Sequence, residues 1–241
     1  MEQMEIARRR KVETLMKLFV YGCSFSDRFG GVNHCYGDIL SKKLNVEYSH
    51  HGVAKCGSND RIYRQLTNDV LEGDVTSDDL VLIQYTTPMR KEFATWVNPR
   101  PTSNVRETIN DYHLVRYKDG CHQWHHHEVI KDFLKIYEEY MSITHFDYVN
   151  FKLENIRLQT FLAHYDINAC ILGLTCYAPM QQDMDISIPY FKDRIYWNKE
   201  IGDAKDERYA PDDPFHLSEN GHCVLAQSLY TWLNEKGHVN G

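Results

Sequence analysis

The sequence predicts an α/β protein in which helices cover both faces of a central parallel sheet. Three short apolar runs, at residues 17–21, 80–85 and 169–174, are typical of buried strands. Segments with helical periodicity alternate with these runs, as in proteins whose parallel strands are joined by crossover helices. A chain of 241 residues with 42% apolar content can bury one full core, so we expect a single domain over residues 1–241.

Each predicted strand is a short run of apolar and β-branched residues. Residues 17–21 end at Gly22 and carry almost no polar side chain, which favours a strand buried on both faces. Residues 45–49 form a second candidate strand. Residues 80–85 follow an Asp-rich turn and give the clearest strand pattern of the chain, and residues 169–174 give another.

The predicted helices follow from apolar residues spaced at three and four positions. The first begins at Ser58 or Asn59, since either side chain can cap it, and runs to about residue 71 with Ile62 and Leu66 on one face. The last is amphipathic and closes the chain. In addition to the first helix, the predicted helices span residues 128–141, 146–165 and 218–233.

Residues 90–127 are rich in Pro, Asn, Trp, Tyr and His and show no sustained period. We therefore expect an insertion outside the central sheet. Long irregular segments of this kind commonly cover or shape the site of an α/β enzyme.

Charge and composition exclude several function classes. The net charge of −7 and the pI near 6.0 argue against nucleic acid or an anionic membrane as the main partner. No apolar stretch approaches the roughly 18 to 20 residues of a membrane span, and residues 1–17 lack the apolar centre of a secretion signal. Seven cysteines without CxxC spacing favour a reducing compartment. We expect a cytoplasmic protein, with signal-independent export as the alternative; no feature sets an oligomeric state.

Two motifs carry the chemistry. The first strand delivers Ser24 into a turn of small residues, and Asp213 and His216 form a late Asp-x-x-His. A serine hydroxyl becomes a nucleophile when a histidine within hydrogen-bond reach takes its proton. A carboxylate that holds the second nitrogen of that histidine completes the arrangement. The pattern therefore predicts acyl transfer through an ester on Ser24.

The motif Gly22-Cys23-Ser24-Phe25-Ser26-Asp27, the later Gly57-Ser58-Asn59 and the terminal Asp-x-x-His resemble the SGNH or GDSL superfamily of serine hydrolases. The resemblance implies a three-layer α/β/α fold of flavodoxin-like type. It also implies that Ser24 is the nucleophile, although Cys23 stands where the family usually has Asp. Under the same resemblance, His216 is the general base, Asp213 orients it, and the backbone N–H of Gly57 is an oxyanion donor.

The third block of the family departs from its pattern in this chain. Members of the family typically carry Gly-x-Asn-Asp after the third strand. When the predicted strand at residues 80–85 is aligned with that third strand, Pro88 falls at the position of the oxyanion asparagine. Proline offers neither a side-chain donor nor a backbone N–H. The donor that replaces this asparagine would have to come from the remaining polar residues nearby, namely Gln84, Thr86, Thr87 or Arg90.

The leading hypothesis is a carboxylic ester hydrolase that needs no cofactor and no metal. Aromatic residues of the insertion favour a carbohydrate O-acetyl group or another short acyl ester as substrate; they are Trp96, Tyr112, Tyr117 and Trp124. The alternative is a weak or inactive binding module on the same fold. A third hypothesis, a metal-dependent hydrolase, uses a segment without a defined ligand spacing, His122, His125, His126, His127 and Glu128.

Overall fold

A computed structural model describes residues 16–23, 26–28, 32–53, 58–86, 90–94, 112–116, 144–174, 193–198, 209–210 and 213–239. Its centre is a parallel sheet of five strands in the order β2-β1-β3-β6-β7. The strands are β1 (Lys17–Gly22), β2 (Glu47–Val53), β3 (Leu80–Gln84), β6 (Asn168–Leu174) and β7 (Ile195–Asn198).

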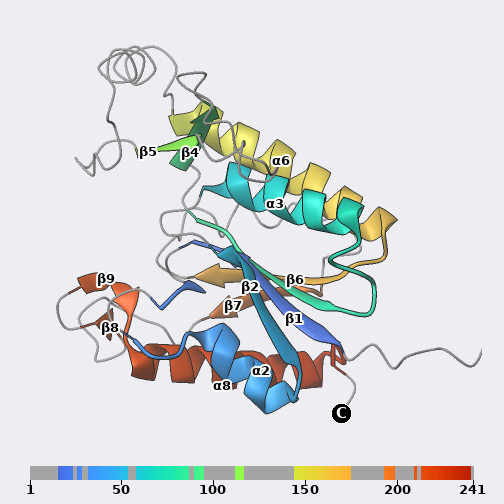
Figure 1. The fold of residues 1–241 in the computed structure, drawn as a ribbon. Helices are drawn as coiled ribbons and strands as arrows, with labels where there is room; N and C mark the ends of the chain where they lie inside the picture. The colour runs from blue at the N-terminus through green and yellow to red at the C-terminus, as the bar shows by residue number, and fades with distance from the viewer. Residues whose placement is uncertain are drawn as a thin grey trace, which may run out of the picture.

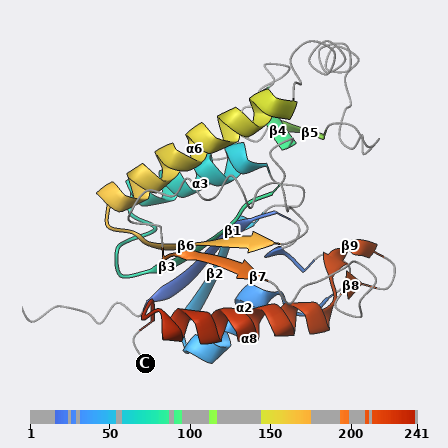
Figure 2. The ribbon, with the colours of Figure 1, turned by 180° about the vertical axis from the view of Figure 1, so that it is seen from behind.

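Helices cover both faces of this sheet (Figure 1). One face carries α2 (Tyr36–Leu44) and α8 (Glu219–Glu235), and the other carries α3 (Asn59–Glu72) and α6 (Thr144–His164). Figure 2 shows the same three layers from behind. The predicted three-layer α/β/α architecture with a parallel sheet is confirmed.

Alternate residues of the strands pack into two separate hydrophobic clusters, because side chains of a strand point to opposite faces in turn. Leu18 and Leu82 pack with α2 and α8, whereas Phe19 and Ile83 pack with α3 and α6. The strand side chains in both clusters are almost fully buried. Burial on both sides explains why these strands appear in the sequence as continuous apolar runs.

The predicted start of α3 is confirmed. Ser58 is the N-cap, and its side chain accepts a hydrogen bond of 3.2 Å from the backbone N–H of Arg61. Gly73 ends the helix with φ of 79°, a left-handed conformation that glycine adopts without steric cost. Leu71, in the last turn of α3, is 59% exposed, whereas Ile62, Leu66 and Val70 are buried on the other side of the helix.

The short helix α2 was not predicted, and the strand predicted at residues 45–49 is partly wrong. Asn45 is the C-cap of α2, with φ of 55°. Strand β2 begins only at Glu47. Gly37 lies in the first turn of α2, and glycine has a low helix propensity, which weakens the helical pattern of the sequence. A Cβ at this position would lie 2.5 Å from the hydroxyl of Tyr48. Glycine thus permits close packing of β2 against α2.

Two small antiparallel strand pairs lie outside the main sheet. The pair β4 (Arg90–Ala94) and β5 (Tyr112–Arg116) falls within the segment predicted to be an insertion and forms a two-stranded sheet of its own. The pair β8 (Tyr209–Ala210) and β9 (Asp213–Leu217) lies beside the start of α8, at the end of the sheet toward which β6 points (Figures 1 and 2).

The predicted helix at residues 128–141 lies outside the described part of the chain. Of the helices that the structure describes, none has the length and apolarity that a membrane crossing requires.

Candidate active site

Cys23 and Ser26, which flank Ser24 and Phe25 in the sequence, are joined by a backbone hydrogen bond. Strand β1 ends at Gly22, and the backbone N–H of Ser26 donates a hydrogen bond of 2.9 Å to the carbonyl of Cys23. Ser24 and Phe25 are the two residues between them and lie outside the described part of the chain. The described ends nevertheless locate this turn at the carboxyl end of β1, where sites of open parallel sheets form.

Gln84, one of the four predicted candidate donors, lies beside this turn and is fully buried. Its Oε1 accepts hydrogen bonds from the hydroxyl of Ser26 at 2.9 Å and from the thiol of Cys23 at 3.5 Å. Its Nε2 donates to the carbonyl of Tyr85. Because the amide is engaged inside the protein, it is poorly placed to reach a substrate oxyanion.

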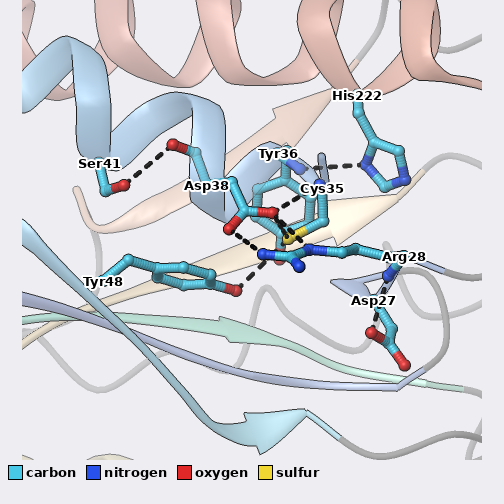
Figure 3. Close-up of polar contacts among 8 residues, drawn as sticks. All are labelled: Asp27, Arg28, Cys35, Tyr36, Asp38, Ser41, Tyr48 and His222. Atoms are coloured by element: carbon cyan, nitrogen blue, oxygen red, sulfur yellow. Dashed lines mark hydrogen bonds and ion pairs between the residues drawn. The ribbon is translucent and has the colours of Figure 1, made fainter. Parts of the chain in front are cut away.

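An ion pair fastens the far end of the same loop to α2 (Figure 3). The guanidinium of Arg28 donates two hydrogen bonds to the carboxylate of Asp38, at 2.9 and 2.6 Å. Asp38 also accepts the backbone N–H of Cys35 at 2.9 Å, which satisfies a free N–H at the start of α2. Burial alone would raise the pKa of Asp38, but the hydrogen bonds from Arg28 and Cys35 hold it below its ordinary value.

His222 joins the first turn of α8 to the first residue of α2 (Figure 3). Its Nδ1 accepts the backbone N–H of Tyr36 at 3.2 Å, and the two rings are stacked with centroids 6.1 Å apart. An N–H can only donate, so Nδ1 carries no proton and the neutral ring is protonated at Nε2.

The groups that shift the pKa of His222 come from three different segments of the chain. Burial lowers the pKa of His222 to about 4, against the opposing effects of the Asp38 and Asp27 carboxylates, and the nearby His216 lowers it further. Asp27 follows Ser24 by three residues, and His216 is the predicted base. One buried ring thus lies within electrostatic range of both the Ser24 loop and the segment that carries His216.

We expect the stability of the protein to fall as the pH falls from about 6.5 to about 4, with a large share from His222. In this window the unfolded histidine binds a proton that the folded one does not, which costs roughly 2 to 3 kcal/mol for a pKa lowered to about 4. The variant His222→Asn keeps an acceptor for the Tyr36 N–H but does not titrate. Urea unfolding at pH 7 and pH 4.5 should show a smaller loss for His222→Asn; an equal loss in both proteins contradicts the assignment.

His216 and Asp213 lie on β9, not on the loop that the motif suggests. Tyr209 pairs with Leu217 and Ala210 with Asp213, so one step along β8 corresponds to four along β9, and the residues between form a bulge. Regular alternation of side chains does not apply within such a bulge. His216 is half-buried, and the side chain of Asp213 lies outside the described residues.

Asn59 fastens the start of α3 to the end of β3. Its Oδ1 accepts the backbone N–H of Thr86 at 2.9 Å, and its Nδ2 donates to the carbonyl of Thr86 at 3.0 Å. The Thr86 N–H is therefore occupied. The Thr86 hydroxyl is buried and has no hydrogen-bond partner within the described part of the chain, so it is the free donor of this residue.

The remaining predicted site residues lie wholly or partly outside the described part of the chain. Gly57 and Thr87 are not among the described residues, and of Arg90 only the backbone, which begins β4, is described. The histidine-rich segment at residues 122–128 is likewise outside. Within the described ranges, no three His, Cys, Asp or Glu side chains are grouped so that they could hold a metal ion.

The sequence did not reveal the roles of three buried polar side chains near the candidate site, Ser26, Gln84 and Asn59. The sequence marks Ser26 only as part of the Gly22–Asp27 motif, Gln84 as a candidate oxyanion donor, and Asn59 as a possible helix cap. The one available signal was the presence of polar residues where apolar strands end, since a buried polar group there needs a partner.

Comparisons with known proteins support the fold. No protein-family model and no curated protein sequence matches the chain. Among solved structures, a protein of the lipolytic G-D-S-L family from Desulfitobacterium hafniense DCB-2 aligns with a TM-score of 0.52 and 12% identity, over 90% of this chain and 99% of the other.

The psychrotrophic esterase EstA from Pseudoalteromonas sp., in a structure inhibited by monoethylphosphonate, aligns with a TM-score of 0.53 and 9% identity, over 91% and 97% of the two chains. Identities this low speak for architecture alone. The sheet order, the two helical layers and these alignments together show that the chain has the fold of the SGNH/GDSL hydrolases.

Proposed function

We propose that the protein is a serine hydrolase that cleaves a carboxylic ester, with Ser24 as nucleophile, His216 as general base and Asp213 as the group that orients it. The observation that carries the proposal is the 3.2 Å hydrogen bond from the Tyr36 N–H to His222, because it joins α2, which follows the Ser24 loop in the sequence, to α8, which follows the strand that carries Asp213 and His216. Segments about 190 residues apart in the sequence meet at one end of the sheet. A histidine base can reach a serine only if such an approach exists.

In the proposed reaction, His216 takes the proton of the Ser24 hydroxyl while Oγ attacks the ester carbonyl carbon. The tetrahedral oxyanion is stabilised by the Gly57 N–H and by a further donor, for which the Thr86 hydroxyl, Thr87 and Arg90 are the candidates. Collapse breaks the bond to the alcohol, which leaves with the proton from His216. Water, activated by the same histidine, then releases the acid and restores Ser24.

We expect a short acyl group as the substrate, such as an O-acetyl group on a carbohydrate. This expectation rests on the aromatic residues of the insertion, which can stack on a sugar ring. Both structural neighbours named above are lipolytic or esterase proteins, which supports an ester as the class of substrate.

The test is covalent labelling of the wild-type protein with a fluorophosphonate probe, followed by peptide mapping. We expect one phosphonyl group per chain, located on the peptide that contains Ser24, together with hydrolysis of p-nitrophenyl acetate. The neighbouring esterase EstA is itself inhibited by a phosphonate. A chain that neither labels nor turns over contradicts the proposal.

That negative result would favour the second candidate, a binding module on the same fold. The observation in its favour is Pro88 at the position of the family asparagine, together with the burial of Gln84, which removes one candidate replacement. Loss of one oxyanion donor commonly costs about 10²- to 10³-fold in turnover. Fluorophosphonate labelling distinguishes the two cases, because a slow enzyme still becomes labelled at Ser24 and an inactive binding module does not.

A further inference from the structure

The buried side-chain amide of Gln84 contacts Cys23 and Ser26, the two residues that flank Ser24 and Phe25 in the sequence. Cys23 and Ser26 are joined by their own backbone hydrogen bond of 2.9 Å. The side chains of both residues donate to one atom, Oε1 of Gln84, at 3.5 and 2.9 Å. An amide oxygen has two lone pairs, so this single atom can accept from both sides of the turn.

The orientation of the Gln84 amide is fixed by its other end. Nε2 donates to the carbonyl of Tyr85, so a flipped amide would place oxygen against oxygen there. The Ser26 hydroxyl has only one hydrogen, which it gives to Gln84. The hydroxyl of Tyr36, 2.9 Å from Ser26 Oγ, must then be the donor of that pair.

The network is dry as well as connected. Gln84, Ser26 and Cys23 are 0% exposed and Tyr36 is 1% exposed. Buried hydrogen bonds of this kind are costly to break, because water cannot replace a lost partner. Gln84 at the end of β3 therefore holds both Cys23 and Ser26, and Tyr36 at the start of α2 holds Ser26 as well.

We propose that Gln84 is a positioning residue, which holds Cys23 and Ser26 on either side of the proposed nucleophile and so fixes the conformation of the turn between them. The catalytic part of this inference rests on the proposed function. A displacement of about 1 Å of a reacting group can cost about 10²-fold in rate. Gln84 itself does not touch the substrate in this account.

The test compares Gln84→Met with Gln159→Met. Methionine has nearly the volume of glutamine and removes both polar functions. Gln159 is a second buried glutamine, 1% exposed, whose Nε2 donates to Asn155 within α6 at 2.8 Å. Both variants should lose thermal stability, so a general effect of a lost buried hydrogen bond appears in both.

We expect only Gln84→Met to slow fluorophosphonate labelling and kcat for p-nitrophenyl acetate, by about 10- to 100-fold with little change in KM. Hydrogen exchange of the Ser26 amide, measured by NMR, should also become faster in that variant alone. Equal labelling in the two variants, or an unchanged Ser26 amide, overturns the inference. An unlabelled wild-type protein contradicts the proposed function. Hydrogen exchange of the Ser26 amide does not need an active enzyme, so it still tests whether Gln84 holds the turn.

The variant Gln84→Glu serves where Gln84→Met does not fold. When protonated, the introduced carboxyl group can accept from Ser26 and donate to the Tyr85 carbonyl, as glutamine does. Burial raises the pKa of such a group, and its ionisation places a negative charge against that carbonyl. The labelling rate relative to wild type should thus be highest at low pH and decrease as pH rises; a pH-independent ratio contradicts the positioning role.

Discussion

Ser24→Ala and His216→Ala are each expected to lower kcat for p-nitrophenyl acetate by at least about 10³-fold. Alanine at position 24 removes the nucleophile, and alanine at position 216 leaves the serine hydroxyl protonated. Because the two residues act as one unit, the double variant should be no slower than the slower single variant. Steady-state assays at pH 8 on all three proteins, with urea unfolding to confirm folding, measure this effect.

The matched control is His164→Asn, at the exposed end of α6. It removes a histidine without approaching the site and should retain wild-type turnover. Losses of Ser24→Ala and His216→Ala that multiply in the double variant would show two independent contributions, which the proposed mechanism does not permit.

Gly22→Ala is expected to destabilise the protein by about 3 kcal/mol and to abolish labelling of Ser24. A Cβ at position 22 would lie 2.3 Å from Ser26 Oγ and 2.9 Å from Ser26 Cβ. The Oγ contact could be relieved by rotation only at the expense of its hydrogen bond to Gln84, and the Cβ contact moves only with the backbone of the turn. The added methyl group therefore opposes the turn itself.

Urea unfolding and fluorophosphonate labelling of Gly22→Ala test this expectation, with Gly73→Ala as the control. Gly73 has φ of 79°, but a Cβ there would meet no atom of the described residues within 4 Å. Alanine there should cost about 1 kcal/mol from backbone strain alone and leave labelling intact. Similar stability losses for the two glycine variants would mean that the contact with Ser26 carries no weight.

The main layers of the fold could be predicted from the sequence because each depends on local pattern. The strands at β1, β3 and β6 are continuous apolar runs, and α3 begins at a serine cap. Helix α2 could not be predicted in this way. It has nine residues, contains glycine in its first turn, and owes its place to contacts with Tyr48 of the next strand and with His222, which comes from a distant part of the chain.

The candidate site divides in the same manner. Ser24 and the Asp213–His216 pair could be selected because their residue types and spacing are themselves the signal. The role of Gln84 could not, because glutamine at the end of a strand has many possible partners. Only the three-dimensional arrangement shows that its oxygen faces Ser26 and Cys23 rather than solvent.

The loop after β1 has two attachments of opposite physical character. The contact of Ser26 with Gln84 is fully buried, whereas the Arg28 side chain of the ion pair with Asp38 is 52% exposed. Dissolved ions weaken this pair only in part, because Asp38 is 10% exposed, but they leave buried neutral hydrogen bonds almost untouched. Salt concentration therefore acts on one anchor and side-chain replacement on the other, so the two ends of a single loop can be loosened separately in the same protein.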